Sequence, residues 1–169
     1  MAYVFETSHL GMQPIATTIL TAATAQPRAW KYGDIVRATD PTYGTGEFIY
    51  LKGVASTAVG SWVTYNADDF STALLAANAI GPVAVAMSAN VASQSGWYQI
   101  SGKAIGLALT GFLDDANVYA TATAGSVDDA VVAGDRVKNA KGASAVGTPS
   151  AGLAEFEISR PFMDDAVAA

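Results

Sequence analysis

The sequence predicts an all-β fold, either a compact antiparallel sandwich or a small barrel. One short phrase occurs three times, and in each copy a glycine and a small polar residue precede alternating apolar and polar side chains. Glycine adopts the positive φ that closes a tight turn, and the alternation is typical of a half-buried strand. The three copies are residues 33–37, 60–64 and 134–138.

Further strands follow from runs of β-branched, aromatic or alternating residues bounded by turn residues about every ten positions. Residues 47–54 are the strongest of these runs, and in 80–87 Val and Met alternate with Ala, as expected where two sheets approach closely. We expect a kink between 96–104 and 105–109. The predicted strands are 34–38, 47–54, 61–66, 80–87, 96–104, 105–109, 117–121, 125–127, 134–138 and 154–160.

Two segments are less regular. Residues 72–79 contain good helix formers, so one short helix is an alternative there to irregular chain. Pro161 is expected to end the last strand, because proline cannot donate a hydrogen bond to a neighbouring strand. Residues 139–152 are mostly small and predict a flexible surface loop.

The chain divides into an N-terminal arm (residues 1–30), a β domain (31–163) and a short C-terminal tail (164–169). The arm contains a single acid and a single base, two prolines and a run of Thr and Ala, which favours an extended segment over a helix. An apolar arm of this kind needs something to pack against. We therefore expect interface residues in the arm and among the tryptophans: Phe5, Ile15, Ile19, Leu20, Trp30, Trp62 and Trp97.

The amino-acid composition limits the kinds of partner that the protein is expected to bind. The 169 residues are 51% apolar, but alanine supplies much of that fraction, so subunit contacts are expected to supplement a thin core. A net charge of −6 argues against binding nucleic acid, which needs clustered Lys and Arg. Cysteine is absent, which excludes thiolate metal sites. Polar residues interrupt the uncharged stretch 73–92, so a membrane span is not expected.

Few residues offer catalytic chemistry. Aspartates occur as four adjacent pairs, but neighbours in a strand point to opposite faces, so we expect solvated turn residues, with incidental cation binding as the alternative. His9 has no second histidine to work with, and Lys103 is expected at an exposed strand end. We therefore predict neither an enzyme nor a cofactor or metal site. The four pairs begin at Asp68, Asp114, Asp128 and Asp164.

The aromatic residues allow a second reading. Trp62 and Tyr65 lie three apart in one strand, and Trp97 and Tyr98 are adjacent, so the members of each pair face opposite ways. We expect one member of each pair in the core and the other facing solvent or a neighbour. An exposed aromatic ring of this kind could stack on a sugar.

Four segments carry a family resemblance: residues 46–54, 79–86, 96–104 and 133–137. Together they resemble the capsid decoration (cement) proteins of tailed bacteriophages. The resemblance implies a compact, β-tulip-like domain, commonly a homotrimer, seated on the outer surface of the capsid over capsomer junctions. It implies the major capsid protein as partner, the host cytoplasm as the place of assembly, and no catalytic residues.

The expected function is therefore a structural virion protein that stabilises a capsid by bridging neighbouring capsomers. The alternative is a glycan-binding or short-fibre module on the virion surface. A hydrolase built on the aspartate pairs and a tail-tube or major shell protein rank below both.

Overall fold

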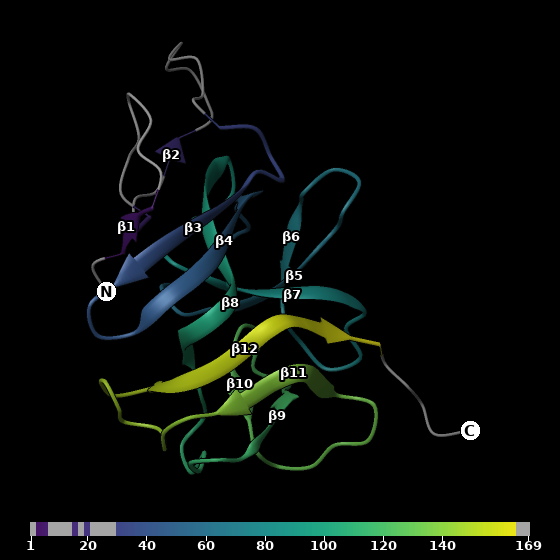
Figure 1. Ribbon diagram of the computed structural model, residues 1–169. Helices are drawn as coiled ribbons and strands as arrows, with labels where there is room; N and C mark the ends of the chain where they lie inside the picture. Colours follow the sequence, from purple (N-terminus) through teal and green to yellow (C-terminus); the bar gives the residue numbers. More distant parts are fainter. Residues whose placement is uncertain (1–2, 7–14, 17–18, 21–29, 165–169) are drawn as a thin grey trace.

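The computed structural model describes residues 3–6, 15–16, 19–20 and 30–164 (Figure 1). These residues form an all-β structure without a helix, as predicted, and every pairing between named strands is antiparallel. The sheet is not closed on itself, so the fold is sandwich-like.

Each predicted strand overlaps an observed one. Their order across the sheet is β1-β3-β4-β8-β7-β12-β11-β9-β10, with β2 beside β8 and with β5 between β6 and β7. The bounds are β1 Val4–Phe5, β2 Ile19–Leu20, β3 Ile35–Asp40, β4 Gly44–Lys52, β5 Trp62–Tyr65, β6 Thr72–Leu74, β7 Gly81–Ala86, β8 Gln94–Leu107, β9 Asn117–Ala120, β10 Val127–Asp128, β11 Arg136–Gly142 and β12 Leu153–Met163.

The core consists of three hydrophobic clusters, two between layers of strands and one on an outer face. The first lies between β5 and β7 and the lower strands β9 to β12, the second covers the outer face of β4 and β8, and the third lies between β4 and β8 on one side and β5 and β7 on the other. In β7, Val83 and Val85 face the first cluster while Ala84 and Ala86 face the third. The small alanines suit the close approach of sheets that the alternation predicts.

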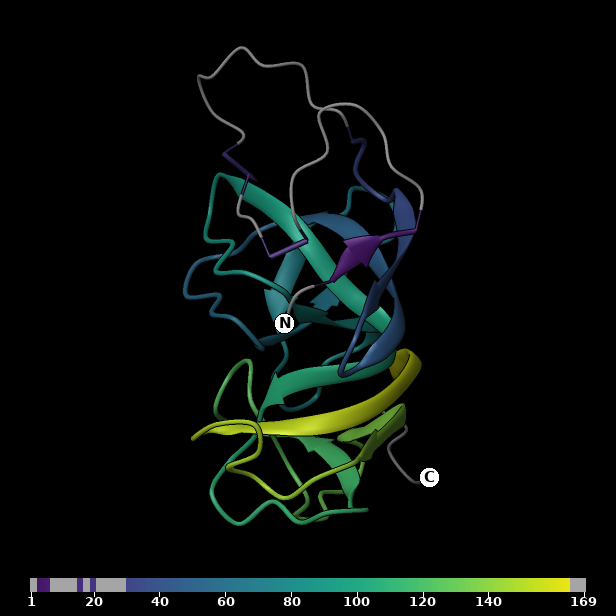
Figure 2. The same cartoon turned by 60° about the vertical axis from the view of Figure 1, so that its left-hand side comes forward.

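The long strand β8 connects the upper and lower halves of the molecule (Figures 1 and 2). Its first half pairs with β4 and its second half with β12. The change of partner occurs at a bulge, where Glu47 is opposite Ser101 but Phe48 is opposite Gln99. The predicted kink therefore falls a few residues earlier than expected, at Gly102, where φ is +96°.

The side chain of Gln99 holds this bend. It is fully buried, and its amide nitrogen Nε2 donates to the carbonyl oxygens of Ser101 and Lys103, each at 3.1 Å. Gly102 is required at the bend because a Cβ there would lie 2.6 Å from the Thr45 carbonyl oxygen.

The repeated phrase forms the same turn in all three copies. Gly33, Gly60 and Gly134 have φ of 87°, 83° and 87°, and each is the third residue of a turn closed by a backbone hydrogen bond from the residue that follows it. A positive φ at that position is what a type II turn requires. Strands β3, β5 and β11 each begin two residues after the glycine. This confirms the prediction of a glycine turn followed by a strand.

Residues 72–79 form strand and turn, which corrects the alternative of a short helix. Thr72–Leu74 is β6, with Leu74 opposite Val63 of β5. The chain then turns at Asn78, where φ is 61°. Asn78 donates its backbone N–H to the buried Asp135 carboxylate at 2.6 Å, so a contact distant in sequence decides this segment.

The final strand continues past Pro161 to Met163, which corrects its expected end. Arg160 has a positive φ of 49°, and beyond it Phe162 lies opposite both Lys138 of β11 and Pro82 of β7. The irregularity at Arg160 places proline where the pairing of β12 changes.

We predict that Gly60→Ala destabilises the protein by about 2–4 kcal/mol, since it combines a strained positive φ with overpacking. A Cβ at Gly60 would lie 3.0 Å from Leu153 Cδ2 and 3.3 Å from the Ile105 carbonyl oxygen. Gly111→Ala is the matched control, because Gly111 has φ of 105° but nothing within 4 Å of an added Cβ. It should cost about 1–2 kcal/mol, the strain alone. Urea unfolding measures both, and equal costs would contradict the packing assigned to Gly60.

Candidate functional site

The predicted interface residues Trp62 and Trp97 are both fully buried within the chain. Trp62 packs edge-on against Phe156 with ring centroids 4.9 Å apart, and Trp97 belongs to the second cluster. Tyr98 is buried too, in the third cluster, because both faces of β8 are covered. This corrects the expectation that one member of the Trp97 and Tyr98 pair would face solvent, and it removes both tryptophans from the surface.

The described parts of the N-terminal arm pack on the chain's own domain. Ile15 is buried, and Phe5 and Trp30 are half-buried beside Trp97, with Phe5 and Trp30 stacked at 6.0 Å between centroids. Ile19 and Leu20 form β2, which pairs with β8, and their side chains lie outside the described structure. The second cluster thus gives the apolar arm at least part of the packing partner it needs.

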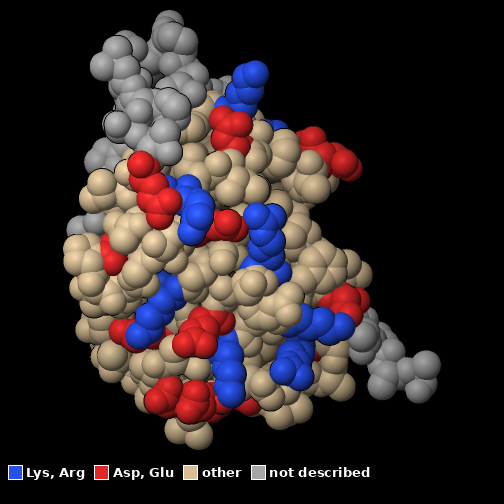
Figure 3. Space-filling view, in the orientation of Figure 1, with Lys and Arg blue, Asp and Glu red and all other residues tan. Residues whose placement is uncertain are grey.

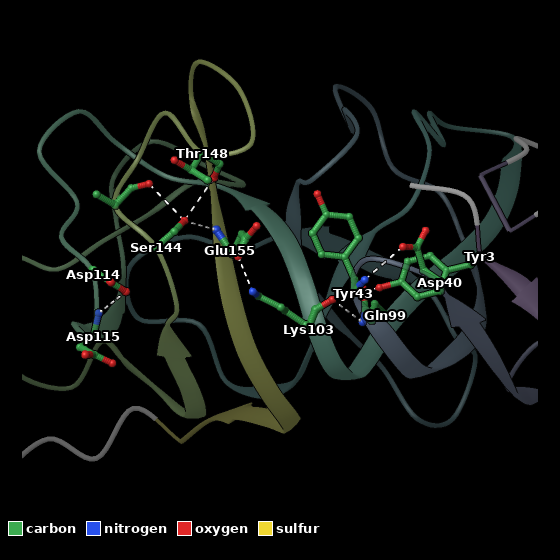
Figure 4. A network of polar contacts seen from close by, with 11 residues as sticks. Tyr3, Asp40, Tyr43, Gln99, Lys103, Asp114, Asp115, Ser144, Thr148 and Glu155 are labelled. Carbon is green, nitrogen blue, oxygen red and sulfur yellow. Dashed lines mark hydrogen bonds and ion pairs between the residues drawn. The ribbon is translucent and has the colours of Figure 1, made fainter.

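Tyr3 fixes the start of the chain to the bend of β8. Its hydroxyl donates to the Lys103 carbonyl oxygen at 3.0 Å, beside Gln99, and its ring packs edge-on against Phe48 (Figure 4). Burial raises the pKa of Tyr3 to about 12, and the nearby Asp40 carboxylate acts in the same direction. The folded state therefore favours the neutral phenol of Tyr3.

Lys103 is partly exposed and forms an ion pair with Glu155 of β12 (Figure 4). The hydrogen bond to Glu155 raises the pKa of Lys103, the opposite of what a buried catalytic amine needs. Ser144 accepts from the Glu155 backbone N–H at 2.9 Å and can donate to the carbonyl oxygens of Ala145 and Thr148, each at 3.2 Å. These contacts hold the loop after β11 against β12.

The aspartate pairs lie in turns or at strand ends. Asp69 accepts hydrogen bonds from Ser71, which lower the pKa of its carboxyl, and Asp164 pairs with Lys138. Within residues 3–6, 15–16, 19–20 and 30–164, no three acidic or histidine side chains come close enough to hold a metal ion. His9 and Asp165 lie outside the described residues.

The face of the molecule that carries β3, β4, β12 and β11 intersperses cations with carboxylates (Figure 3). Arg160 binds Glu47 at 3.0 Å, and Arg37 lies 3.9 Å from Glu6. Lys103 is also opposite Glu157 in the register of β8 and β12. Positive charge on this face is therefore matched by negative charge on neighbouring strands.

A different surface, which we call the acidic tip, is formed by the loops 108–116 and 129–135 at the lower end of the molecule (Figure 1). The backbone N–H of Leu113 donates to Asp129 Oδ2 at 3.1 Å and joins the two loops. Leu113 and Val131 are 62% and 80% exposed, and all four residues of the apolar run 130–133 are exposed. Asp114, Asp115 and Asp129 give the tip its charge, whereas Asp135 is buried, and the two loops contain neither Lys nor Arg.

Another part of the surface is an open groove of about 420 Å³ beside Tyr65, where the β5–β6 hairpin meets the start of β7. Tyr65 is half-buried against the third cluster, and burial raises its pKa. Ile80 on the opposite wall is 69% exposed. All residues that line the groove are uncharged: Thr64, Tyr65, Asn66, Ala67, Ser71, Thr72, Ala73, Ile80, Gly81 and Pro82.

Neither the acidic tip nor the groove was among the predicted sites. The run Ala130-Val131-Val132-Ala133 is visible in the sequence between two Asp-containing turns, and it was the available signal for the tip. The groove left no such signal, because its walls come from two separate turns.

Comparison with known proteins gives no relative: no family model, curated protein or solved structure matches this chain. Within the described residues, no helix has the length and apolar character needed to cross a membrane.

We predict that Tyr3 titrates near pH 12 in the folded protein instead of near 10. Because its folded pKa is raised, the stability linked to its neutral form is present below pH 10 and is lost as pH rises from 10 toward 12. The ¹³Cζ resonance of labelled tyrosine, assigned by its loss in Tyr3→Phe, measures this pKa. A midpoint near 10 would mean that Tyr3 is solvated.

Proposed function

We propose that this protein is a structural virion component that decorates a bacteriophage capsid and stabilises it by bridging neighbouring capsomers. The short segments that resemble cement proteins support this proposal. The acidic tip is the structural observation that carries it.

Exposed aliphatic side chains at the tip are costly to leave in water. A run of four consecutive exposed apolar residues is unusual in a soluble domain unless a partner covers it. Burying a valine contributes about 1.5 kcal/mol or more, so Val131, Val132 and Leu113 offer substantial binding energy in a small area.

The charge of the tip selects the kind of partner. Asp114, Asp115 and Asp129 accompany the aliphatic residues, so a second copy of the same tip would meet like charge. A surface with an apolar pocket flanked by Lys or Arg is complementary, and on this proposal the major capsid protein provides it. In a homotrimer three tips would bind as one unit, and their effective concentration would multiply weak contacts.

The alternative of a glycan-binding module no longer rests on Trp62 or Trp97, because both are buried. Tyr65 in the groove is the aromatic residue that keeps a sugar-binding role open.

We predict that the purified protein binds expanded empty capsids of its source phage at fixed stoichiometry and raises their rupture temperature. The double variant Val131→Ser/Val132→Ser should bind at least ~10-fold more weakly, since it removes two aliphatic side chains that the capsid surface would bury. Its thermal unfolding should match the wild type, because both side chains are exposed. Sedimentation with the capsids and thermal-shift measurements test these outcomes.

Ile35→Ser is the control, since Ile35 is also exposed (46%) but lies in β3, in the upper half of the molecule and away from the tip (Figure 1). It should leave capsid binding unchanged. Wild-type protein that binds no capsid, or a double variant that binds as well as wild type, would refute the proposed role of the tip.

A further inference from the structure

We propose that the groove beside Tyr65 is a binding site for a neutral saccharide. This inference is independent of the acidic tip and of capsid binding, since it concerns a different surface and a different class of ligand.

The groove has the size and the fixed walls of a small-molecule site. Its volume of about 420 Å³ falls within the roughly 300–1,000 Å³ usual for ligand pockets. β5, whose Thr64 and Tyr65 line the groove, pairs with β6 on one side and β7 on the other, so the backbone of the site is held by hydrogen bonds. Asn66 accepts from the Asp68 backbone N–H at 2.8 Å and closes the turn at one end.

The apolar walls of the groove suit the face of a sugar ring. Tyr65 is anchored from behind by the third cluster, so its ring is held in place. Ile80 and Pro82 line the opposite wall, and Phe162, which is 40% exposed, lies opposite Pro82 in the sheet register. Sugar rings present C–H groups on their faces, which pack on aromatic and aliphatic side chains.

The polar groups of the groove suit hydroxyls. Ser71 donates its hydroxyl hydrogen to Asp69, so its oxygen keeps lone pairs that can accept. The Thr72 hydroxyl is instead engaged with the Lys52 carbonyl oxygen and the buried Tyr98. Among the described residues nothing accepts from the Asn66 side-chain amide, which can donate. A ligand rich in hydroxyls, each both donor and acceptor, matches this set.

Charge and topology argue against other ligands. No charged side chain lines the groove, and the charged groups nearest to it are already paired: Arg160, which acts on Tyr65, binds Glu47, and Asp69, which accepts from Ser71, lies 3.7 Å from Lys52. An anionic or cationic ligand would therefore lose solvation without gaining a free counter-ion. An added peptide strand needs an unpaired edge, and β5, which lines the groove with Thr64 and Tyr65, is already paired on both sides. Among the described strands β6 pairs only with β5, so the test includes a peptide to probe that edge. A neutral saccharide needs neither a counter-ion nor a strand edge.

The test is a ¹H–¹⁵N NMR titration of the full chain with maltose, lactose, N,N′-diacetylchitobiose and N-acetylneuraminic acid, each to about 50 mM. We expect at least one neutral sugar to shift amides of the groove, and Tyr65→Ala to weaken that binding at least ~10-fold. Tyr43→Ala is the matched control, because Tyr43 is a half-buried tyrosine of the second cluster, away from the groove. It should bind as the wild type does.

Ile80→Asp provides a second variant if Tyr65→Ala fails to fold, since Ile80 is largely exposed and its replacement leaves the core intact. It should also abolish binding of the neutral sugar. The inference is overturned if none of the neutral sugars shifts the groove amides or if only N-acetylneuraminic acid binds. It is equally overturned if a neutral tetrapeptide such as Ala-Ser-Gly-Ala binds in their place, or if the groove amides change with protein concentration, as contact with a second copy would cause.

Discussion

The bend of β8 at Gln99 is the constraint on which the rest of the structure depends. A strand that pairs with β4 before the bend and with β12 after it must redirect its backbone hydrogen bonds, and the buried amide of Gln99 donates to two of the carbonyls in the bend. Since unpaired buried carbonyls are costly, this side chain and Gly102 make the change of partner possible. Tyr3 binds at the same place, so the N-terminal segment, the upper sheet and the lower sheet meet there.

Local chemistry made the strands and turns predictable, whereas burial depended on contacts distant in sequence. Glycines such as Gly33 signalled a turn because few other residues accept positive φ, and a strand followed each copy. Alternation, however, predicts one buried and one exposed face, and it failed for Trp97 and Tyr98 because β8 is covered on both sides. Of the candidate surfaces, the acidic tip was partly predictable, because the apolar run 130–133 is visible in the sequence. The groove beside Tyr65 was not, because it forms only where the β5–β6 hairpin meets β7.

The surface divides into regions of different chemical character. On one face, cations and carboxylates alternate along neighbouring strands, so the charges are exposed to water and no single sign is concentrated there (Figure 3). The acidic tip combines carboxylates with exposed aliphatic residues, and the groove is uncharged. A domain that contacts a protein lattice at one end and a small neutral ligand at its side would use the last two regions separately.

The most direct measurement of the central claim is the free energy of unfolding of Gln99→Leu compared with that of Gln94→Leu. Gln94 lies at the start of the same strand, is only half-buried, and accepts a single exposed hydrogen bond from Val91. Gln99→Leu should cost about 2–3 kcal/mol, because it leaves the Ser101 carbonyl without its side-chain donor and the Lys103 carbonyl with the Tyr3 hydroxyl alone, whereas Gln94→Leu should cost about 1 kcal/mol or less. Equal costs, with amide hydrogen exchange in β12 unchanged by Gln99→Leu, would show that the bend does not depend on Gln99.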